Sequence, residues 1–303
     1  MSALSMGSLF PKELVTEMFS KVKGHSSLAK MAPSEPVPFT GKDYFTFQFD
    51  SDVSIVGENG AKPAGDASID PVTVKPLKVV YQSRVSDEFM TAAEDYRLNV
   101  LKEFAAAFAK KMGAALDKMA IHGINPATGL PATATIGNNY FDYVCADTAI
   151  TYSGSAPDDN LESAIKVLED NEYAPNGIAM APIMRGAMGA MVNNANGAKY
   201  PGFQFGGVSD LNGIKVDSNI TVGSASKSND RALVGDFNAF RWGYAKQIPL
   251  EVIEYGNPDN SEAGDLKGHN QVLLRSEAWI GWGILDKNAF CLVCKDGTPI
   301  ITT

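Results

Sequence analysis

The first 38 residues have the spacing of a short helix followed by an extended segment. Apolar side chains recur at helical spacing between residues 11 and 23, with Leu14 and Phe19 among them, and Gly24 is a stop signal. Prolines 33, 36 and 38 then remove backbone donors and predict an extended connection. A helix of about ten residues is marginal alone in water. We therefore expect this arm to dock on its own body or on a neighbour.

Residues 44–84 change to a period of two, which predicts strands. Phe45, Phe47 and Phe49 alternate with polar residues, and a second strand is expected over residues 71–84. The stretch between them is rich in turn formers. The simplest interpretation is a long two-stranded hairpin. Because two strands cannot bury their own apolar face, we expect another surface to cover it.

A single long helix is the next predicted element. Ser86 has the character of an N-cap, and apolar residues recur at helical spacing from Glu94 to about Ile121, before the stop signal Gly123. About 28 residues at 1.5 Å each would span roughly 40 Å. The opposite, polar face is expected to carry Lys102, Glu103, Lys110, Lys111, Asp117 and Lys118.

The remaining residues predict a mixed α/β unit and then antiparallel strands. Helices are expected over residues 161–171 and around 185–193, and strands at 177–181, 214–216 and 232–237. Alternation returns over 248–255 and 271–282, and an apolar strand over 290–293 closes the chain. This order of elements places the protein in the α+β class, with a compact α/β unit in its second half.

Composition narrows the function classes. The 303 residues are 45% hydrophobic and 20% charged, which is too apolar for a disordered chain. The net charge of −9 argues against a protein that holds nucleic acid mainly by neutralising phosphates. The N-terminus has no secretory signal pattern, and the longest uncharged stretch, residues 119–141, is interrupted by glycine and proline, so no membrane span is expected.

The reactive residues are few and scattered. Cys291 and Cys294 have the spacing of redox and zinc motifs, but their flanks predict a buried strand on which they point to opposite faces. His122 directly follows the long helix and is interpreted as favouring its negative end. Dinucleotide, phosphate-loop and nucleophile-elbow motifs do not occur. We therefore nominate no catalytic, cofactor-binding or metal-binding residue, and no cofactor.

The ordered set of elements resembles the tailed-bacteriophage major capsid protein family with the HK97-type fold. No single motif is specific, but the set covers nearly the whole chain. Residues 56–63 resemble the tip of that family's E-loop, 79–89 the E-loop return and start of the spine helix, and 123–131 the loop after it. Residues 211–216, 235–237 and 274–290 resemble the strands of the A-domain and P-domain.

The resemblance implies an α+β HK97-like fold and a division of the chain. The expected parts are an N-terminal arm (1–38), the E-loop hairpin with flanking P-domain strands (39–85), a P-domain with the spine helix (86–156), an A-domain (157–240), returning P-domain strands (241–289) and a C-terminal A-domain strand (290–303). The expected assembly contacts are Leu14, Phe19, Gly57, Glu58, Lys62 and Pro63.

The resemblance also implies a function, that of the structural protein which self-assembles into the icosahedral shell around a phage genome. The expected partners are further copies in pentamers and hexamers, portal, protease or decoration proteins, and double-stranded DNA held without sequence reading. Because the chain begins almost at the arm, a separate scaffolding protein, or none, is expected. The expected location is the virion, after assembly in the host bacterial cytoplasm.

Two other functions are left open by the sequence. An encapsulin-like nanocompartment shell shares the fold but encloses cargo protein rather than DNA. A cytosolic α/β enzyme is the alternative from a different class, although no residue pattern nominates one. Covalent crosslinking of the E-loop occurs in some relatives, and Lys62, Lys75 and Lys78 are available, but no partner asparagine can be matched here.

Overall fold

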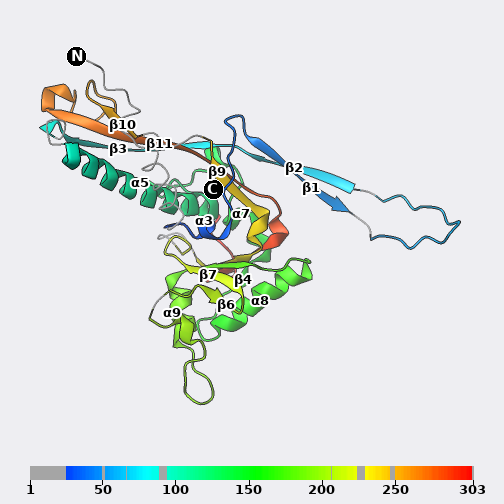
Figure 1. The fold of residues 1–303 in the computed structure, drawn as a ribbon. Coiled ribbons are helices and arrows are strands. Elements are labelled where there is room, and N and C mark those ends of the chain that lie inside the picture. The colour runs from blue at the N-terminus through cyan, green and yellow to red at the C-terminus, as the bar shows by residue number, and fades with distance from the viewer. Residues whose placement is uncertain are drawn as a thin grey trace.

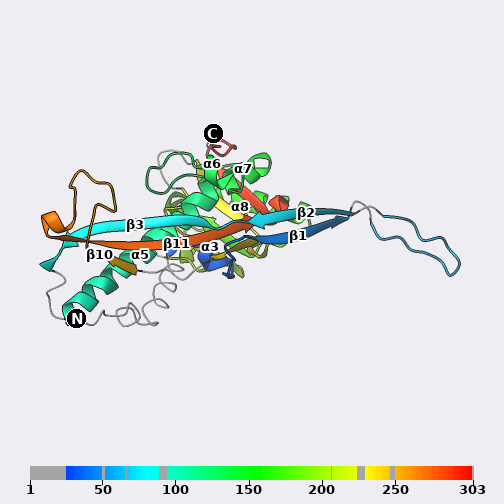
Figure 2. The same cartoon turned by 90° about the horizontal axis from the view of Figure 1, so that it is seen from above.

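The computed structural model describes residues 25–49, 52–65, 67–88, 94–205, 207–223, 229–245 and 250–301. Two sheets and a long helix form the body, and a two-stranded ribbon projects far from it (Figure 1). The long helix lies along one face of a sheet (Figure 1), and seen from above the ribbon extends beyond the end of that sheet (Figure 2). Among the described residues, no helix is long and apolar enough to cross a membrane.

The first sheet lies along the long helix. It has the order β10-β11-β3, with β9 pairing with the far end of β11. The elements are β3 (Leu77–Ser86), α5 (Glu94–His122), β9 (Phe240–Tyr244), β10 (Leu250–Ile253) and β11 (Gln271–Ile284). Leu101 of the helix packs against Leu250, Val272 and Leu274 of the sheet. The predicted antiparallel pairing of the 248–255 and 271–282 segments is confirmed by β10 and β11.

The second sheet has six strands in the order β4-β12-β8-β5-β7-β6. Both of its faces are covered. Leu161 and Leu168 of one helix and Met184 and Met188 of another lie on one side, and the end of α5 with its neighbouring segments lies on the other. The elements are β4 (Ile150–Thr151), α8 (Pro157–Asp170), β5 (Gly177–Met180), α9 (Pro182–Ala190), β6 (Asp210–Leu211), β7 (Ile214–Ser218), β8 (Asp230–Gly235) and β12 (Phe290–Cys294).

Short helices fill the connections between these elements. They are α3 (Ser27–Met31), α6 (Thr133–Ile136), α7 (Phe141–Val144), η1 (Ala146–Thr148), η2 (Pro201–Phe203), η3 (Phe237–Ala239), η4 (Lys267–His269) and η5 (Lys287–Ala289). The aromatic ring of Phe141, from α7, lies 4.8 Å from that of Phe290 in β12 and 5.5 Å from that of Phe240. These contacts make α7 part of the main core, although the sequence around it shows no clear periodicity.

The predicted strand over residues 71–84 is two strands. β2 (Ala67–Val74) pairs antiparallel with β1 (Lys42–Phe49) in the ribbon, and β3 pairs with β11 in the body. Between them Pro76 has no N–H to donate to a ladder. The expected hairpin is therefore confirmed for β1 and β2 only, and the chain after Val74 belongs to the body.

Two details of the predicted long helix are tested. The Oγ of Ser86 accepts the N–H of Glu88 at 3.4 Å, as a cap would, and Gly123 with a φ of 63° follows the last helical residue. Asp117, however, is not on an exposed polar face, because its side chain is completely buried. The exposed face of α5 is therefore richer in lysine than the sequence pattern suggests.

Candidate assembly surfaces and a buried ionic cluster

The ribbon exposes apolar side chains that no other part of the described structure covers. Phe45 is 63% exposed and Ile69 is 53% exposed. Beyond the paired strands, Val53 and Ile55 are fully exposed in the loop at the far end (Figure 2). Only at the base does the ribbon reach the core, where Val74 packs against Gly281 and Gly283 of β11. A Cβ at position 283 would lie 2.6 Å from the side chain of Val74, so the close contact between the base of the ribbon and β11 requires glycine at this position.

A tight turn shapes the far end of the ribbon. The N–H of Gly60 donates to the carbonyl oxygen of Gly57 at 2.9 Å, and Glu58 and Asn59 occupy the central positions. A Cβ at Gly60 would lie 2.9 Å from the side chain of Val56, so a larger residue would open the turn. The turn therefore presents Glu58 to solvent in a fixed position.

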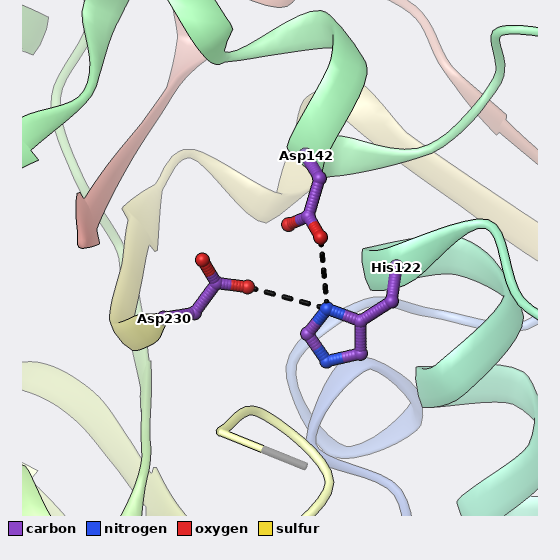
Figure 3. A group of neighbouring side chains, drawn as sticks. All are labelled: His122, Asp142 and Asp230. Atoms are coloured by element: carbon purple, nitrogen blue, oxygen red, sulfur yellow. Dashed lines mark hydrogen bonds and ion pairs between the residues drawn. The ribbon is translucent and has the colours of Figure 1, made fainter. Parts of the chain in front are cut away.

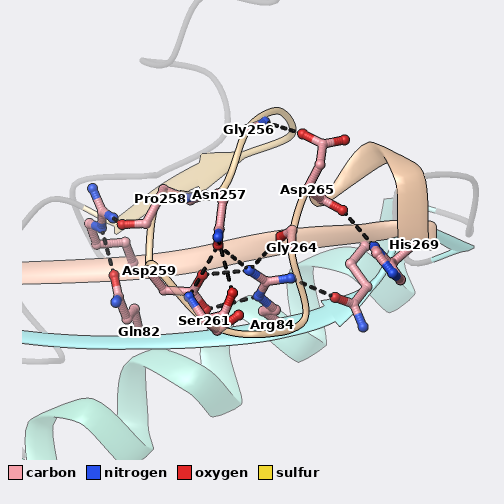
Figure 4. A network of polar contacts seen from close by, with 12 residues as sticks. Gln82, Arg84, Gly256, Asn257, Pro258, Asp259, Ser261, Gly264, Asp265 and His269 are labelled. Atoms are coloured by element: carbon pink, nitrogen blue, oxygen red, sulfur yellow. Dashed lines mark hydrogen bonds and ion pairs between the residues drawn. The ribbon is translucent and has the colours of Figure 1, made fainter.

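The opposite end of the body carries a second exposed loop, residues 254–270, which one arginine organises (Figure 4). The guanidinium of Arg84 donates two bonds to the carboxylate of Asp259 and one each to Asn257, Gly264 and Gln271. The Arg84 side chain is only 12% exposed, and its hydrogen bonds hold the pKa of Asp259 well below the usual carboxyl range. This segment is thus an exposed loop whose conformation is held by the hydrogen bonds of Arg84.

The arm joins the body through a buried carboxylate. Asp117 accepts hydrogen bonds from the Oγ of Ser26 at 2.5 Å, from the backbone N–H groups of Ser27 and Leu28, and from the Oγ of Thr221 at 2.5 Å. Burial raises the pKa of Asp117, while these donors act in the opposite direction. Since the first N–H groups of a helix have no internal partner, Asp117 supplies acceptors for α3 and fixes it on α5.

The next part of the arm adds to the first sheet. Ser34 forms a parallel bridge with Trp242, and the N–H groups of Glu35 and Val37 donate to the carbonyl oxygens of Trp242 and Tyr244. The prolines expected to give an extended connection lie between and beside these donors. The prediction of an extended segment after residue 32 is therefore confirmed, and its docking surface is β9 of the same chain.

Close to Asp117 lies a cluster of three buried ionisable side chains, His122, Asp142 and Asp230 (Figure 3). The Nδ1 of His122 lies 3.0 Å from Oδ2 of Asp142 and 3.2 Å from Oδ2 of Asp230. Burial alone would lower the pKa of His122, but the two carboxylates outweigh it and raise this pKa well above its ordinary value. Burial and the charge of Asp230 raise the pKa of Asp142, and His122 outweighs burial to lower that of Asp230.

The cluster is formed by residues far apart in the sequence. His122 ends α5, Asp142 lies in α7 and Asp230 begins β8. The expectation that His122 only complements the end of its helix is wrong, because its ring lies inside the core between two carboxylates. No sequence spacing could have indicated the cluster, since its members meet only when the helix and the six-stranded sheet have packed together.

The order of these parts is that of a known protein family, and the sequence can be compared with the profile of that family. The sequence profile of the phage capsid family matches residues 7–294. The chain belongs to the phage capsid family. This capsid protein is similar to a solved structure from Mycobacterium phage Ogopogo, with 31% identity and a TM-score of 0.76 over 89% of this chain and 92% of that chain.

Two further solved structures share the fold of this capsid protein. One, from Gordonia phage Cozz, has 23% identity and a TM-score of 0.74 over 89% of this chain and 86% of the other. Another, described as the capsid of an empty GTA particle, has 15% identity and a TM-score of 0.61 over 89% and 90%. No curated protein matches this sequence.

These comparisons confirm the HK97-like fold and the function of a major capsid protein, a structural component of the virion. They do not favour the encapsulin-like alternative. Assembly of the capsid protein into a shell of repeated subunits is supported by the capsid structures that it resembles.

The predicted contact residues of this capsid protein fall in two places. Gly57, Glu58, Lys62 and Pro63 all lie in the exposed loop at the far end of the ribbon. Leu14 and Phe19 lie outside the described residues. What the sequence analysis missed are the exposed aliphatic side chains before the turn, Val53 and Ile55, because their alternation with Asp52 and Ser54 does not show that they stay outside a core.

The cysteines of this capsid protein lie as predicted. Cys291 and Cys294 are buried on β12, Cys291 in the core under α8 and α9 and Cys294 in the core on the other face of the sheet. Burial raises the pKa of Cys291 to about 12 and that of Cys294 further still. Both thiols are therefore protonated and unreactive at neutral pH.

Proposed function

We propose that the ribbon and the arm of this capsid protein are its assembly contacts, each completed by a neighbouring copy. The observation that carries the proposal is the ribbon, whose loop presents two fully exposed aliphatic side chains, Val53 and Ile55. Burying one aliphatic side chain of this size contributes about 1.5–3 kcal/mol. Within the described part of the chain nothing covers them, so a neighbour is the surface that would gain this free energy.

The turn residues have distinct proposed parts in that contact. The carbonyl oxygen of Gly57 closes the turn, and Pro63 stiffens the segment that leads from it towards β2. Glu58 and Lys62, both exposed, supply charges of opposite sign that fix the register against a neighbour. Leu14 and Phe19 of the arm are proposed to bury an apolar helix face in the same way.

Repetition makes modest contacts sufficient. A ribbon reaching from one subunit onto the next is a heterologous contact, which closes into rings such as pentamers and hexamers when the rotation allows it. Each subunit both gives and receives a ribbon, so the free energy of every contact adds cooperatively across the shell. The proposed result is an icosahedral shell assembled in the host cytoplasm.

The genome would be enclosed rather than bound. A net charge of −9 gives no general attraction for phosphates, so double-stranded DNA is proposed to be held without sequence reading. We propose that the inner surface of the shell repels DNA weakly. Three exposed lysines of α5, Lys102, Lys110 and Lys111, give one face of the subunit a positive charge, and an inner surface formed mainly by that face would contradict this part of the proposal. Scaffolding, portal, protease and decoration proteins stay predictions of the resemblance.

The domain division is also proposed, with one adjustment. Residues 157–240 and 290–303 are proposed to form the A-domain, because β5, β7, β8 and β12 share one sheet. β4, at Ile150–Thr151, pairs with β12 in the same sheet, so we place the boundary before Ile150 rather than after residue 156.

Shortening the ribbon tests the proposed contact. Residues 52–65 are replaced by a two-residue turn, which leaves the pairing of β1 and β2 in place, and the protein is examined by circular dichroism and electron microscopy. We expect soluble, folded subunits that form no closed shells. A control with residues 52–65 replaced by a glycine-serine linker of equal length separates side-chain chemistry from reach. Normal shells from the shortened chain would contradict the proposed role of the ribbon. For the arm, the matching test removes residues 1–24, and normal shells from that variant would contradict the proposed role of the arm.

A further inference from the structure

The His122–Asp142–Asp230 cluster lies at the junction between the long helix and the six-stranded sheet, away from the ribbon and next to Thr221, which also bonds the Asp117 that docks the arm. His122 is 3% exposed, Asp142 is 2% exposed and Asp230 is fully buried. A shell subunit with no chemistry to perform has no evident use for two carboxylates in its core, because burying a charge without compensation is costly. The hydrogen bonds around the cluster indicate what would compensate it.

In His122 and Asp230, the atom that points away from the centre of the cluster already has a hydrogen-bond partner. The Nε2 of His122 lies 3.0 Å from the carbonyl oxygen of Thr221, which can only accept, so Nε2 carries a hydrogen. The Sγ of Cys294 donates to Oδ1 of Asp230 at 3.3 Å. These partners leave Nδ1 of His122 facing both carboxylates and Oδ2 of Asp230 facing Nδ1 (Figure 3). Metal-binding histidines and carboxylates are held by outer partners of this kind.

Asp142 is the member whose carboxylate is not fully used. Its Oδ2 faces His122, and its buried Oδ1 receives no hydrogen bond from any described group. The carboxylate is turned towards the other two side chains rather than away from them (Figure 3). A buried oxygen of this kind destabilises the fold unless something binds it.

We propose that the cluster is a structural zinc site, with Nδ1 of His122 and the carboxylates of Asp142 and Asp230 as ligands. One ligand atom from each residue lies within 4.8 Å of the others. The two contacts from Nδ1, at 3.0 and 3.2 Å, approach the separation of about 3.3 Å between neighbouring ligands of a tetrahedral zinc ion. If Oδ1 of Asp142 binds as well, that carboxylate becomes a bidentate ligand and the coordination departs from a regular tetrahedron.

Charge and ligand type both favour this ion. A divalent cation with two carboxylates and a neutral imidazole forms a site with no net charge, which a dry core tolerates. An imidazole nitrogen together with carboxylate oxygens suits zinc better than calcium or magnesium, which prefer oxygen alone. The ion would tie the end of α5 to α7 and to β8, three segments that meet only in the folded chain. It would therefore enter as the chain folds and hold the helix against the sheet.

Metal content tests the site directly. The full chain, as purified capsomers or shells, is incubated with ZnCl₂, freed of unbound metal and measured by mass spectrometry. We expect about one zinc ion per chain. Asp142→Asn should reduce the content to background, and the control Asp147→Asn, the same change five positions along the chain, should leave it unchanged. Full zinc content in Asp142→Asn would overturn the proposal, because the ion would then lie elsewhere.

A second measurement does not depend on any variant folding. The wild-type chain is stripped with a chelator, and its melting temperature is recorded with and without ZnCl₂. We expect a rise of several degrees with zinc, since a ligand that binds only the folded state stabilises it. No bound zinc and no rise would overturn the proposal. In that case an Asp142→Asn variant that melts like the wild type would show that a proton shared between the two carboxylates fills the place of the ion.

Discussion

The ribbon and the six-stranded sheet are both built from short apolar strands, yet they treat those strands in opposite ways. Every residue of β12 and all but one of β8 are buried, because helices cover one face of the sheet and the main core covers the other. In the ribbon, Phe45 and Ile69 remain more than half exposed. The sheet is covered on both faces within one chain, whereas no other described part of the chain covers these side chains of the ribbon.

This contrast predicts that the sheet determines the stability of the subunit and that the ribbon determines its assembly. Substitutions in the sheet should change the free energy of unfolding of the subunit, and substitutions in the ribbon should change the yield of shells.

The largest effect is expected in the sheet. Phe290→Ala removes a ring that contacts Phe141 and Phe237 in the fully buried strand β12. We expect a loss of about 3–5 kcal/mol in the free energy of unfolding, because the cavity cannot be filled. Denaturant unfolding of the subunit measures it. A loss below that of an ordinary surface substitution would show that this core is not what stabilises the chain.

An intermediate effect is expected where the arm joins the body. Asp117→Asn keeps the shape of the side chain but turns an amide group towards the donors of Ser26 and Thr221. We expect a loss of about 1–3 kcal/mol, since at least one buried donor loses its acceptor. Glu103→Gln, on the exposed side of the same helix, is the matched control and should be neutral. Equal stability of the two variants would mean that α3 docks without Asp117.

A pH-dependent effect is expected in the loop held by Arg84. The pKa of Asp259 is lowered, so the ionised carboxylate is the form that stabilises the fold. Its contribution is complete above the ordinary carboxyl pKa of about 3.9 and is lost as the pH falls through the lowered folded-state value. We expect amide exchange in residues 254–270, corrected for its intrinsic rate, to accelerate only on strong acidification. Asp259→Asn should remove that pH dependence, and if it does not, another group controls the loop.

The smallest effect on the subunit is expected in the ribbon. Phe45→Ser changes an exposed side chain, so the free energy of unfolding should change by no more than about 0.5 kcal/mol. Shell yield, measured by sedimentation, should nevertheless fall, because the same side chain is proposed to be buried by a neighbour. A destabilised subunit, or an unchanged yield of shells, would remove the distinction between ribbon and sheet.

Much of the fold could be predicted because its signals are local. The period-two run at Phe45 indicated a ribbon strand, the helical spacing ending at Gly123 indicated the long helix, and the unbroken apolar run at Phe290 indicated a strand buried on both faces. Each of these signals lies within a single helix or strand and depends only on the spacing of apolar residues in that segment.

What could not be predicted depends on contacts between distant segments. Asp117 looks like a surface residue in its own helix, and only the arm and Thr221 make its burial favourable. His122, Asp142 and Asp230 have no common spacing, because their positions are set by the packing of a helix against a sheet. The exposure of Val53 and Ile55 is likewise a property of the folded chain, not of the pattern around them.

The attachment of the arm to β9 has a consequence for uniformity between copies. Glu35 and Val37 donate to the carbonyl oxygens of Trp242 and Tyr244, and the Cβ of any residue other than glycine at position 243 would lie 1.5 Å from the carbonyl oxygen of Glu35. A shift by one residue would bring Pro36 opposite a carbonyl that it has no hydrogen to satisfy. A shift by one residue in either direction therefore loses at least one of the two bonds, which favours the same alignment of residues 35–37 in every copy of the chain.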